Sequence, residues 1–196
     1  MMNAHLPMLL CLAVLATLLA AALWHDLRTR RIPNRLVLWG TLAGLIINSF
    51  VPSGAGLFDA SFGGLGLLQA LAGAAAGLAL LLPMYLLRAL GAGDVKLMAM
   101  CGAFLGPDAV LEAALLTFLC GGVLALAAAL AGQRLRQVLK NTYHMMLGAL
   151  LHSLAGGAAT IAEPPPATGK LAYAFAIASG TLLQVFLHYT HLWSLR

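Results

Sequence analysis

Long runs of apolar residues, separated by short polar stretches, dominate the sequence. Most runs approach the roughly 20 residues that an α-helix needs to cross a bilayer, and none shows the alternating pattern of a membrane barrel strand. The pattern therefore predicts an all-α polytopic membrane protein with six transmembrane helices, forming a single domain over residues 1–196. We expect these helices at about residues 6–25, 36–51, 65–87, 95–106, 109–131 and 171–193.

The segment between the last two runs has a different pattern. Residues 133–162 combine basic and apolar positions in the manner of an amphipathic helix that lies on the membrane surface. We therefore expect a cytoplasmic surface helix between transmembrane helices five and six. An alternative is that residues 145–162 cross the membrane as a seventh span, which would place the carboxyl terminus on the other side.

Composition supports a membrane protein. Hydrophobic residues make up 62% of the chain and charged residues 9%, whereas a soluble domain has roughly 25% charged residues. The net charge of +5 does not indicate nucleic-acid binding, because the Lys and Arg residues lie between apolar runs and not on one soluble face. This composition predicts that the lipid bilayer surrounds the protein.

The basic residues predict the orientation of the helices. Lys and Arg gather on the cytoplasmic side of membrane proteins. With six spans, only Arg196 falls on the opposite side, and the amino terminus is periplasmic. The residues on the expected cytoplasmic side are Arg28, Arg30, Arg31, Arg35, Arg88, Lys96, Arg134, Arg136, Lys140 and Lys170.

The cysteines and histidines do not suggest a metal site. Cys11, Cys101 and Cys120 stand alone in apolar runs and form no CxxC pair, so a zinc site is not expected. We interpret them as packing residues, and we expect neither a metal nor an organic cofactor.

Two aspartates stand out among the six acidic residues. Asp26 ends the first predicted helix and Asp94 opens the fourth, so both are expected at the cytoplasmic membrane boundary. Each residue alone could simply mark a helix end, with Asp26 paired to a nearby arginine. Ionisable groups at membrane depth nevertheless indicate a functional site. Glu112, near the outer end of the fifth helix, is expected to snorkel or to make a polar contact.

Two neighbouring carboxyl groups have a specific chemical use. They share one proton, so that the ionised group takes a proton from water while the protonated group donates to a carbonyl oxygen. This is the scheme of aspartic proteases. Gly91 and Gly93, which precede Asp94, would allow a sharp turn and leave room for an extended substrate.

Three stretches resemble one family. "GAGDVK" resembles the G-x-G-D-x-K signature of type IV prepilin peptidases, which are polytopic aspartic proteases. "DLRTRRIPN" at residues 26–34 resembles their first aspartate and the following I/L-P-N/D turn. "KLAYAFAIASG" at residues 170–180 is similar to a late segment of the family, with Ala172 and Ala174 in place of its usual Pro and Gly.

The resemblance implies a GxGD-type intramembrane aspartic protease architecture without a cofactor. It implies that Asp26 and Asp94 are catalytic, and it places six further residues in motifs or near the substrate. It also implies a prepilin or pseudopilin substrate with a basic leader and an apolar helix. The site would face the cytoplasmic boundary of a bacterial inner membrane. The six further residues are Gly91, Gly93, Lys96, Pro33, Asn34 and Tyr173.

Larger members of that family carry a cytoplasmic domain with CxxC pairs, linked to methylation, between their first two helices. Here only the stretch "DLRTRRIPNR" occupies that place. We therefore expect a peptidase without methyltransferase activity, similar to the short enzymes of Tad/Flp-type pilus systems.

Three other interpretations remain open at this point. A proton-coupled transporter could use Asp26 and Asp94 as relay groups, although such acids usually lie near mid-membrane. A non-enzymatic assembly subunit of a pilus or secretion system would not depend on either aspartate. A presenilin-like protease shares the GxGD motif, but the IPN turn after Asp26 fits it poorly. The oligomeric state does not follow from the sequence.

Overall fold

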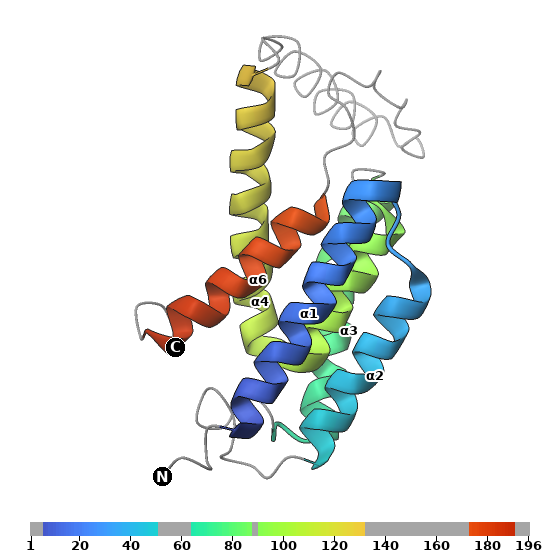
Figure 1. Cartoon of the computed structure of the whole chain (residues 1–196), viewed down its shortest axis with the longest axis vertical. Helices are drawn as coiled ribbons and strands as arrows, with labels where there is room; N and C mark the ends of the chain where they lie inside the picture. The colour runs from blue at the N-terminus through green and yellow to red at the C-terminus, as the bar shows by residue number, and fades with distance from the viewer. Residues whose placement is uncertain (1–5, 51–63, 88–89, 132–172, 191–196) are drawn as a thin grey trace, which may run out of the picture. The chain divides into compact units, whose positions relative to one another are not determined.

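The computed structural model describes residues 6–50, 64–87, 90–131 and 173–190, with side chains from residue 9 onward except at position 129. Every regular element in these ranges is an α-helix, which confirms the all-α fold (Figure 1). Residues 6–121 and 173–190 form one compact unit, and residues 122–131 belong to a second. The helices are α1 (Leu6–Thr29), α2 (Asn34–Phe50), α3 (Leu67–Leu86), α4 (Ala92–Ala131) and α6 (Tyr173–Tyr189).

The first half of α4 is the centre of the first unit. Six of its side chains larger than alanine are at most 1% exposed, which means that neighbouring helices cover it on all sides. Asn48 of α2 donates a hydrogen bond of 2.7 Å to the Ala103 carbonyl oxygen and is itself buried. A polar side chain therefore fixes α2 against this central segment. The six side chains are Leu97, Met98, Met100, Cys101, Phe104 and Leu105.

One residue divides α4 into two helical segments. Gly106 has φ 80° and ψ 176°, which is outside the helical region and is readily adopted only by glycine. Pro107 follows it, and proline favours an extended residue before it and the first turn of a helix after it. The helices predicted at 95–106 and 109–131 are thus joined by a single non-helical residue, Gly106, and the chain is already helical again at residues 107–108.

Helices α3 and α4 cross at a point where only glycine fits. A methyl group added at Gly73 would meet the Gly102 carbonyl oxygen, and one added at Gly102 would meet the Gly73 carbonyl oxygen. Small residues allow such close backbone approach in membranes, where apolar side chains gain little by leaving lipid. This crossing places the central segment of α4 against α3.

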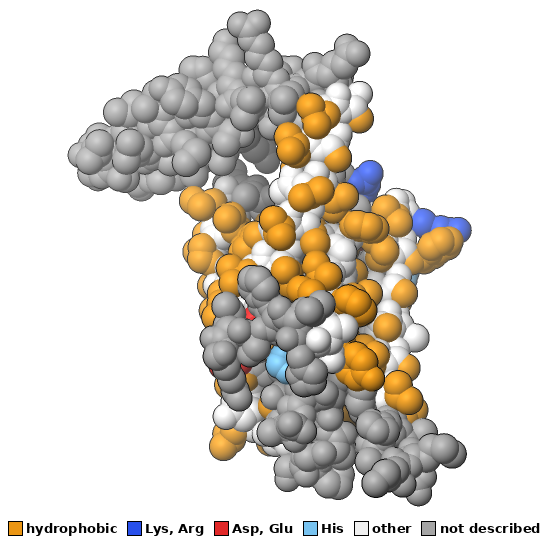
Figure 2. Space-filling model, turned by 90° about the vertical axis from the view of Figure 1, so that its left-hand side faces the viewer, with side chains coloured by type: hydrophobic (Ala, Val, Ile, Leu, Met, Phe, Trp, Pro, Cys, Tyr) orange, Lys and Arg blue, Asp and Glu red, His pale blue; other side chains and the backbone are white. Residues whose placement is uncertain are grey.

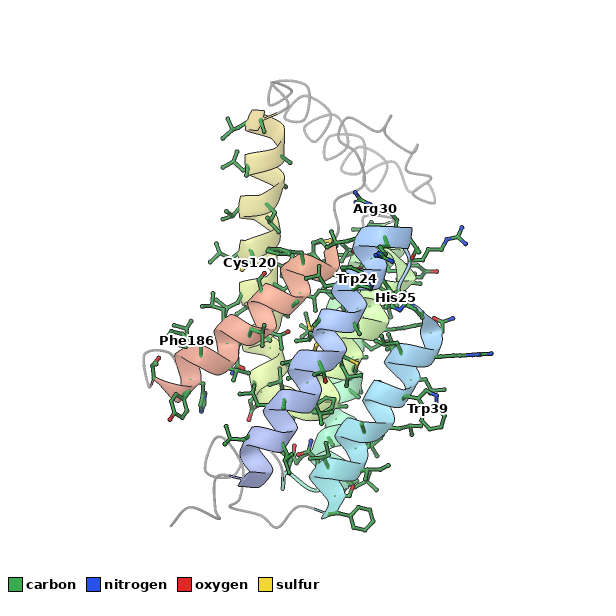
Figure 3. The ribbon with its side chains drawn as sticks, in the orientation of Figure 1. Trp24, His25, Arg30, Trp39, Cys120 and Phe186 are labelled. Atoms are coloured by element: carbon green, nitrogen blue, oxygen red, sulfur yellow. The ribbon has the colours of Figure 1, made fainter. Side chains whose placement is uncertain are left out.

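The outer faces of the helices are apolar. Trp39 is 67% exposed, Phe50 is 83% exposed, and Phe186 is also exposed. Figure 3 shows Trp39 and Phe186 pointing away from the neighbouring helices, and the described side chains on the face in Figure 2 are mostly hydrophobic. Such a surface is suited to lipid.

Three of the described helices are long and apolar enough to cross a membrane: Leu9–Thr29, Leu67–Leu86 and Ala92–Ala128. Helices α2 and α6 have 17 residues each. The topology with six spans remains a prediction. The surface helix at 133–162 and its alternative, a span at 145–162, lie outside the described residues, as do Arg88, Arg134, Arg136, Lys140 and Lys170.

Candidate active site

Asp26 lies on the last turns of α1, one turn before the helix ends. Its backbone carbonyl accepts a hydrogen bond of 2.9 Å from the amide of Arg30, which has a left-handed φ of 54° and ends the helix. Figure 3 shows Trp24, His25 and Arg30 at this end of α1. The neighbours Trp24 and His25 are exposed, whereas the Asp26 side chain is only 8% exposed. Asp26 therefore points into the bundle.

Asp94 lies in the first turn of α4, as its third residue. Its Oδ2 accepts a hydrogen bond of 3.1 Å from the backbone N–H of Gly91, and its own N–H donates to the Gly91 carbonyl at 3.1 Å. The carboxylate thus satisfies an amide that the start of a helix leaves unpaired. This contact fixes the Asp94 side chain at the amino-terminal end of α4, where it is half-buried.

The two carboxyl groups come from helices far apart in the sequence, and Asp26 lies near enough to Asp94 to act on it electrostatically. When two carboxyl groups are close and shielded from water, having both ionised is unfavourable, and the pair retains a proton. The arrangement can therefore supply an acid and a base at one place. The structure brings together the two residues that the sequence singled out.

The amino-terminal end of α6 forms another wall of this site. The backbone N–H of Ala174 donates to Oδ2 of Asp26 at 3.4 Å, and the Tyr173 phenol is close enough to Asp94 for an electrostatic interaction. A free N–H at a helix start stabilises a negative charge. Tyr173 was expected near the site. The contact from Ala174 was missed, because a backbone donor leaves no mark in the sequence.

The IPN turn packs directly on the GxGD motif. A methyl group at Gly93 would lie 3.2 Å from Cβ of Ile32, so glycine allows this close contact. Nζ of Lys96 donates a hydrogen bond of 3.0 Å to Oδ1 of Asn34, the first residue of α2. The Pro33 carbonyl accepts from the Leu36 amide at 3.1 Å. These contacts fix the relative position of the two segments that carry Asp26 and Asp94.

The glycines before Asp94 make contacts that the sequence did not reveal. Among the described residues, only Gly64, Gly66 and Gly106 are glycines with positive φ, so Gly91 and Gly93 do not form a left-handed turn. Gly93 instead provides space for Ile32, and Gly91 provides the N–H that Asp94 accepts. The hydrogen bond from the Asp94 N–H to the Gly91 carbonyl closes a turn before Asp94 without a left-handed glycine, and position 93 requires a small residue for close packing.

Replacing Lys96 with methionine should lower activity of this site by about fivefold, the effect of losing one exposed hydrogen bond. Asn34→Leu should have a similar effect, and the double variant should be no worse than either single one, because both changes remove the same contact. The measurement is the rate of substrate cleavage. Arg35→Met is the matched control, since it removes an exposed cation from the same turn. Fully additive effects would show that the contact does not act as a pair.

The sequence model of the type IV leader peptidase family matches residues 13–126, which is more than half of the chain. The chain belongs to this family. No curated protein and no solved structure gives a significant match.

Membership of the type IV leader peptidase family implies that the protein is a protease. Asp26 and Asp94 both lie within the matched residues, together with the IPN turn and the GxGD motif. Helix α6 lies beyond them, although its Ala174 amide donates to Asp26 and its Tyr173 phenol interacts electrostatically with Asp94. Part of the candidate site therefore lies beyond the residues that the family model matches.

Proposed function

We propose that the protein is a membrane-embedded aspartic endopeptidase that removes the basic leader from Flp-like type IV prepilins or pseudopilins. The observation that carries this proposal is that Asp26 lies near enough to Asp94 to act on it electrostatically, beside the start of α6. A prepilin has a short basic leader followed by an apolar helix, so its cleavage site lies at the membrane boundary. Two carboxyl groups at the end of the membrane helices lie at a suitable depth.

In the proposed mechanism, the ionised aspartate takes a proton from a water molecule. The water oxygen forms a bond to the carbonyl carbon of the scissile peptide, while the protonated aspartate donates its proton to the carbonyl oxygen. In the collapse of the tetrahedral intermediate, the second aspartate takes a proton back from one hydroxyl group as the C=O bond re-forms and the C–N bond breaks, and the leaving nitrogen receives a proton from the first aspartate. The pair therefore returns to its starting state with one proton, and water supplies all the atoms added.

The charges of the described residues support a cytoplasmic location of the site. All five described Lys and Arg residues lie in the last turn of α1, in the connection to α2, or in the first turns of α2 and α4, and positive residues favour the cytoplasmic side. We propose that the enzyme resides in a bacterial inner membrane, with six spans and a periplasmic amino terminus. The five residues are Arg28, Arg30, Arg31, Arg35 and Lys96.

The short connection between α1 and α2 supports a peptidase without methyltransferase activity. Only residues 30–33 separate the two helices, and this leaves no room for an inserted domain there. By analogy with short members of the family, we propose a substrate from a Tad/Flp-type pilus system.

The test is the processing of a prepilin by the full-length protein in proteoliposomes. We expect the wild type to release the leader as one fragment, detected by mass spectrometry, and to leave the new amino terminus unmethylated when a methyl donor is added. A prepilin with an acidic residue at the scissile position serves as a control for nonspecific proteolysis. If the wild type releases no leader, the proposed function is wrong, and a transporter or an assembly subunit becomes the better interpretation.

A further inference from the structure

Helix α6 packs antiparallel to the second segment of α4, and contacts recur about once per turn. A methyl group at Gly121 would lie 3.5 Å from Cβ of Ala176, and one at Gly180 would lie 2.5 Å from the Thr117 nitrogen. One turn further along, Nε2 of Gln184 donates to Oε2 of Glu112 at 3.3 Å. The two helices therefore have a defined register.

The last of these contacts is polar and lies deep in the bundle. Glu112 is 6% exposed and Gln184 is fully buried, so Glu112 does not snorkel to the surface but makes the polar contact that the sequence allowed. Oε1 of Gln184 has no hydrogen-bond partner among the described residues, so the hydrogen bond from Nε2 to Glu112 is the polar contact that holds this amide. A carboxyl group and an amide thus face each other in a buried interface between α4 and α6.

This polar pair lies far from the aspartates. Gln184 is ten residues after Ala174 on α6, a distance of about 15 Å along a helix at 1.5 Å per residue. Neither Glu112 nor Gln184 belongs to the motifs around Asp26 and Asp94. Any effect of the pair on the site must therefore act through the position of α6.

A polar pair can determine the register of a membrane helix more strictly than apolar packing does. Apolar side chains gain little by leaving lipid for protein, whereas an unpaired amide in an apolar environment is unfavourable. A slip of α6 by one residue rotates its side chains by about 100° and separates Gln184 from Glu112. Gly180 adds a steric constraint, because its lack of a side chain allows close approach to Thr117.

We propose that Glu112 and Gln184 are positioning residues that set the register of α6 and so bring Tyr173 and Ala174 to the two aspartates. In the correct register, the Ala174 N–H reaches Asp26 and the Tyr173 phenol lies near Asp94. In a shifted register, both contacts are lost, although Asp26 and Asp94 remain on α1 and α4. This inference rests on the proposed proteolysis for its effect on activity, but the register itself can be measured independently.

The register can be followed with a cross-link to a native cysteine. The Thr181 hydroxyl lies 3.7 Å from Sγ of Cys101, and both residues are buried. In a Cys11→Ala/Cys120→Ala background, Thr181→Cys should therefore form a disulfide with Cys101 on mild oxidation of the membrane-embedded full-length protein. Leu182→Cys, one residue further and exposed, is the matched control and should not cross-link.

Adding Gln184→Leu to the Thr181→Cys protein should lower the yield of this cross-link by about fivefold or more. In the protein that keeps Thr181, Gln184→Leu should lower the rate of prepilin cleavage by about fivefold or more. Glu112→Gln keeps a hydrogen-bonding partner, and the exchange Glu112→Gln/Gln184→Glu restores the pair, so both should retain cross-linking and cleavage. This rescue distinguishes a positioning pair from residues that merely fill space.

Three outcomes would overturn the proposal. Gln184→Leu with unchanged cross-linking would show that the pair does not set the register, whatever happens to cleavage. Reduced cross-linking with normal cleavage would show that the site does not depend on the register. Failure of the exchanged pair to restore both would show that the pair itself is not the cause. If the wild type does not cleave prepilin, the proposed function fails, and the cross-link still tests the register.

Discussion

Replacing Asp26 or Asp94 with asparagine should lower the rate of leader cleavage by about three orders of magnitude or more, because each change removes a proton-transfer group that the mechanism requires. Asparagine has nearly the same shape and keeps a side-chain oxygen. Asn at position 94 can still accept from the Gly91 amide, and Asn at position 26 can still accept from the Ala174 amide. The variants should therefore fold, and the loss should lie in the chemical step.

The measurement is single-turnover cleavage of prepilin in proteoliposomes, with gel filtration in detergent to verify folding. Asp108→Asn is the control, because Asp108 is an exposed acid on the same helix but distant in sequence from the GxGD motif. It should cleave at close to the wild-type rate. Cleavage near the wild-type rate by the Asp26 or the Asp94 variant would exclude the two-aspartate mechanism, and would favour a transporter or an assembly subunit.

Replacing Gly102 with leucine should prevent the protein from reaching its folded state in detergent or lipid. A side chain at this position would collide with the backbone of Gly73, and a collision with backbone cannot be relieved by changing a rotamer. Overpacking of a core costs about 1–3 kcal/mol even where side chains adjust, and more is expected here. Gly73→Leu should have the same effect from the other side of the crossing.

Thermal unfolding and resistance to added protease are the measurements for this prediction. Gly122→Leu is the matched control, since it introduces the same side chain into the same helix at a position with nothing within 4 Å. It should leave the unfolding temperature close to that of the wild type. A Gly102→Leu variant as stable as this control would show that α3 and α4 do not cross as closely as described.

The helices were largely predictable, because apolar runs of the length of a membrane span leave few alternatives to an α-helix. The end of α1 and the break within α4 were harder to predict. The sequence placed the end of the first helix at residue 25, whereas α1 continues to Thr29, since one further turn is polar but still helical. The break between the helices predicted at 95–106 and 109–131 is a single non-helical residue, Gly106, because a Gly-Pro pair can end one helix and start the next without a loop.

The candidate site was predictable only in part. Asp26 and Asp94 stood out because ionisable side chains are rare in apolar sequence. Each also lies in or next to a family motif, the IPN turn that contains Asn34 or the G-x-G-D-x-K signature that contains Lys96. The contacts of Ala174 with Asp26 and of Ile32 with Gly93 involve a backbone N–H and a missing side chain, which composition and spacing do not reveal. Gln184 gave a weaker signal, because it is an amide within an apolar helix. Only the fold identifies its partner, Glu112.

The most direct test of the central claim is a double-mutant cycle on the two aspartates. The single-turnover rate of prepilin cleavage is measured for the wild type, Asp26→Asn, Asp94→Asn and the double variant. If the two carboxyl groups act as one unit, the double variant will be no slower than the slower single variant, because either change already removes the shared function. Effects that multiply in the double variant, or a single variant that retains the wild-type rate, would contradict a site built from Asp26 and Asp94 together.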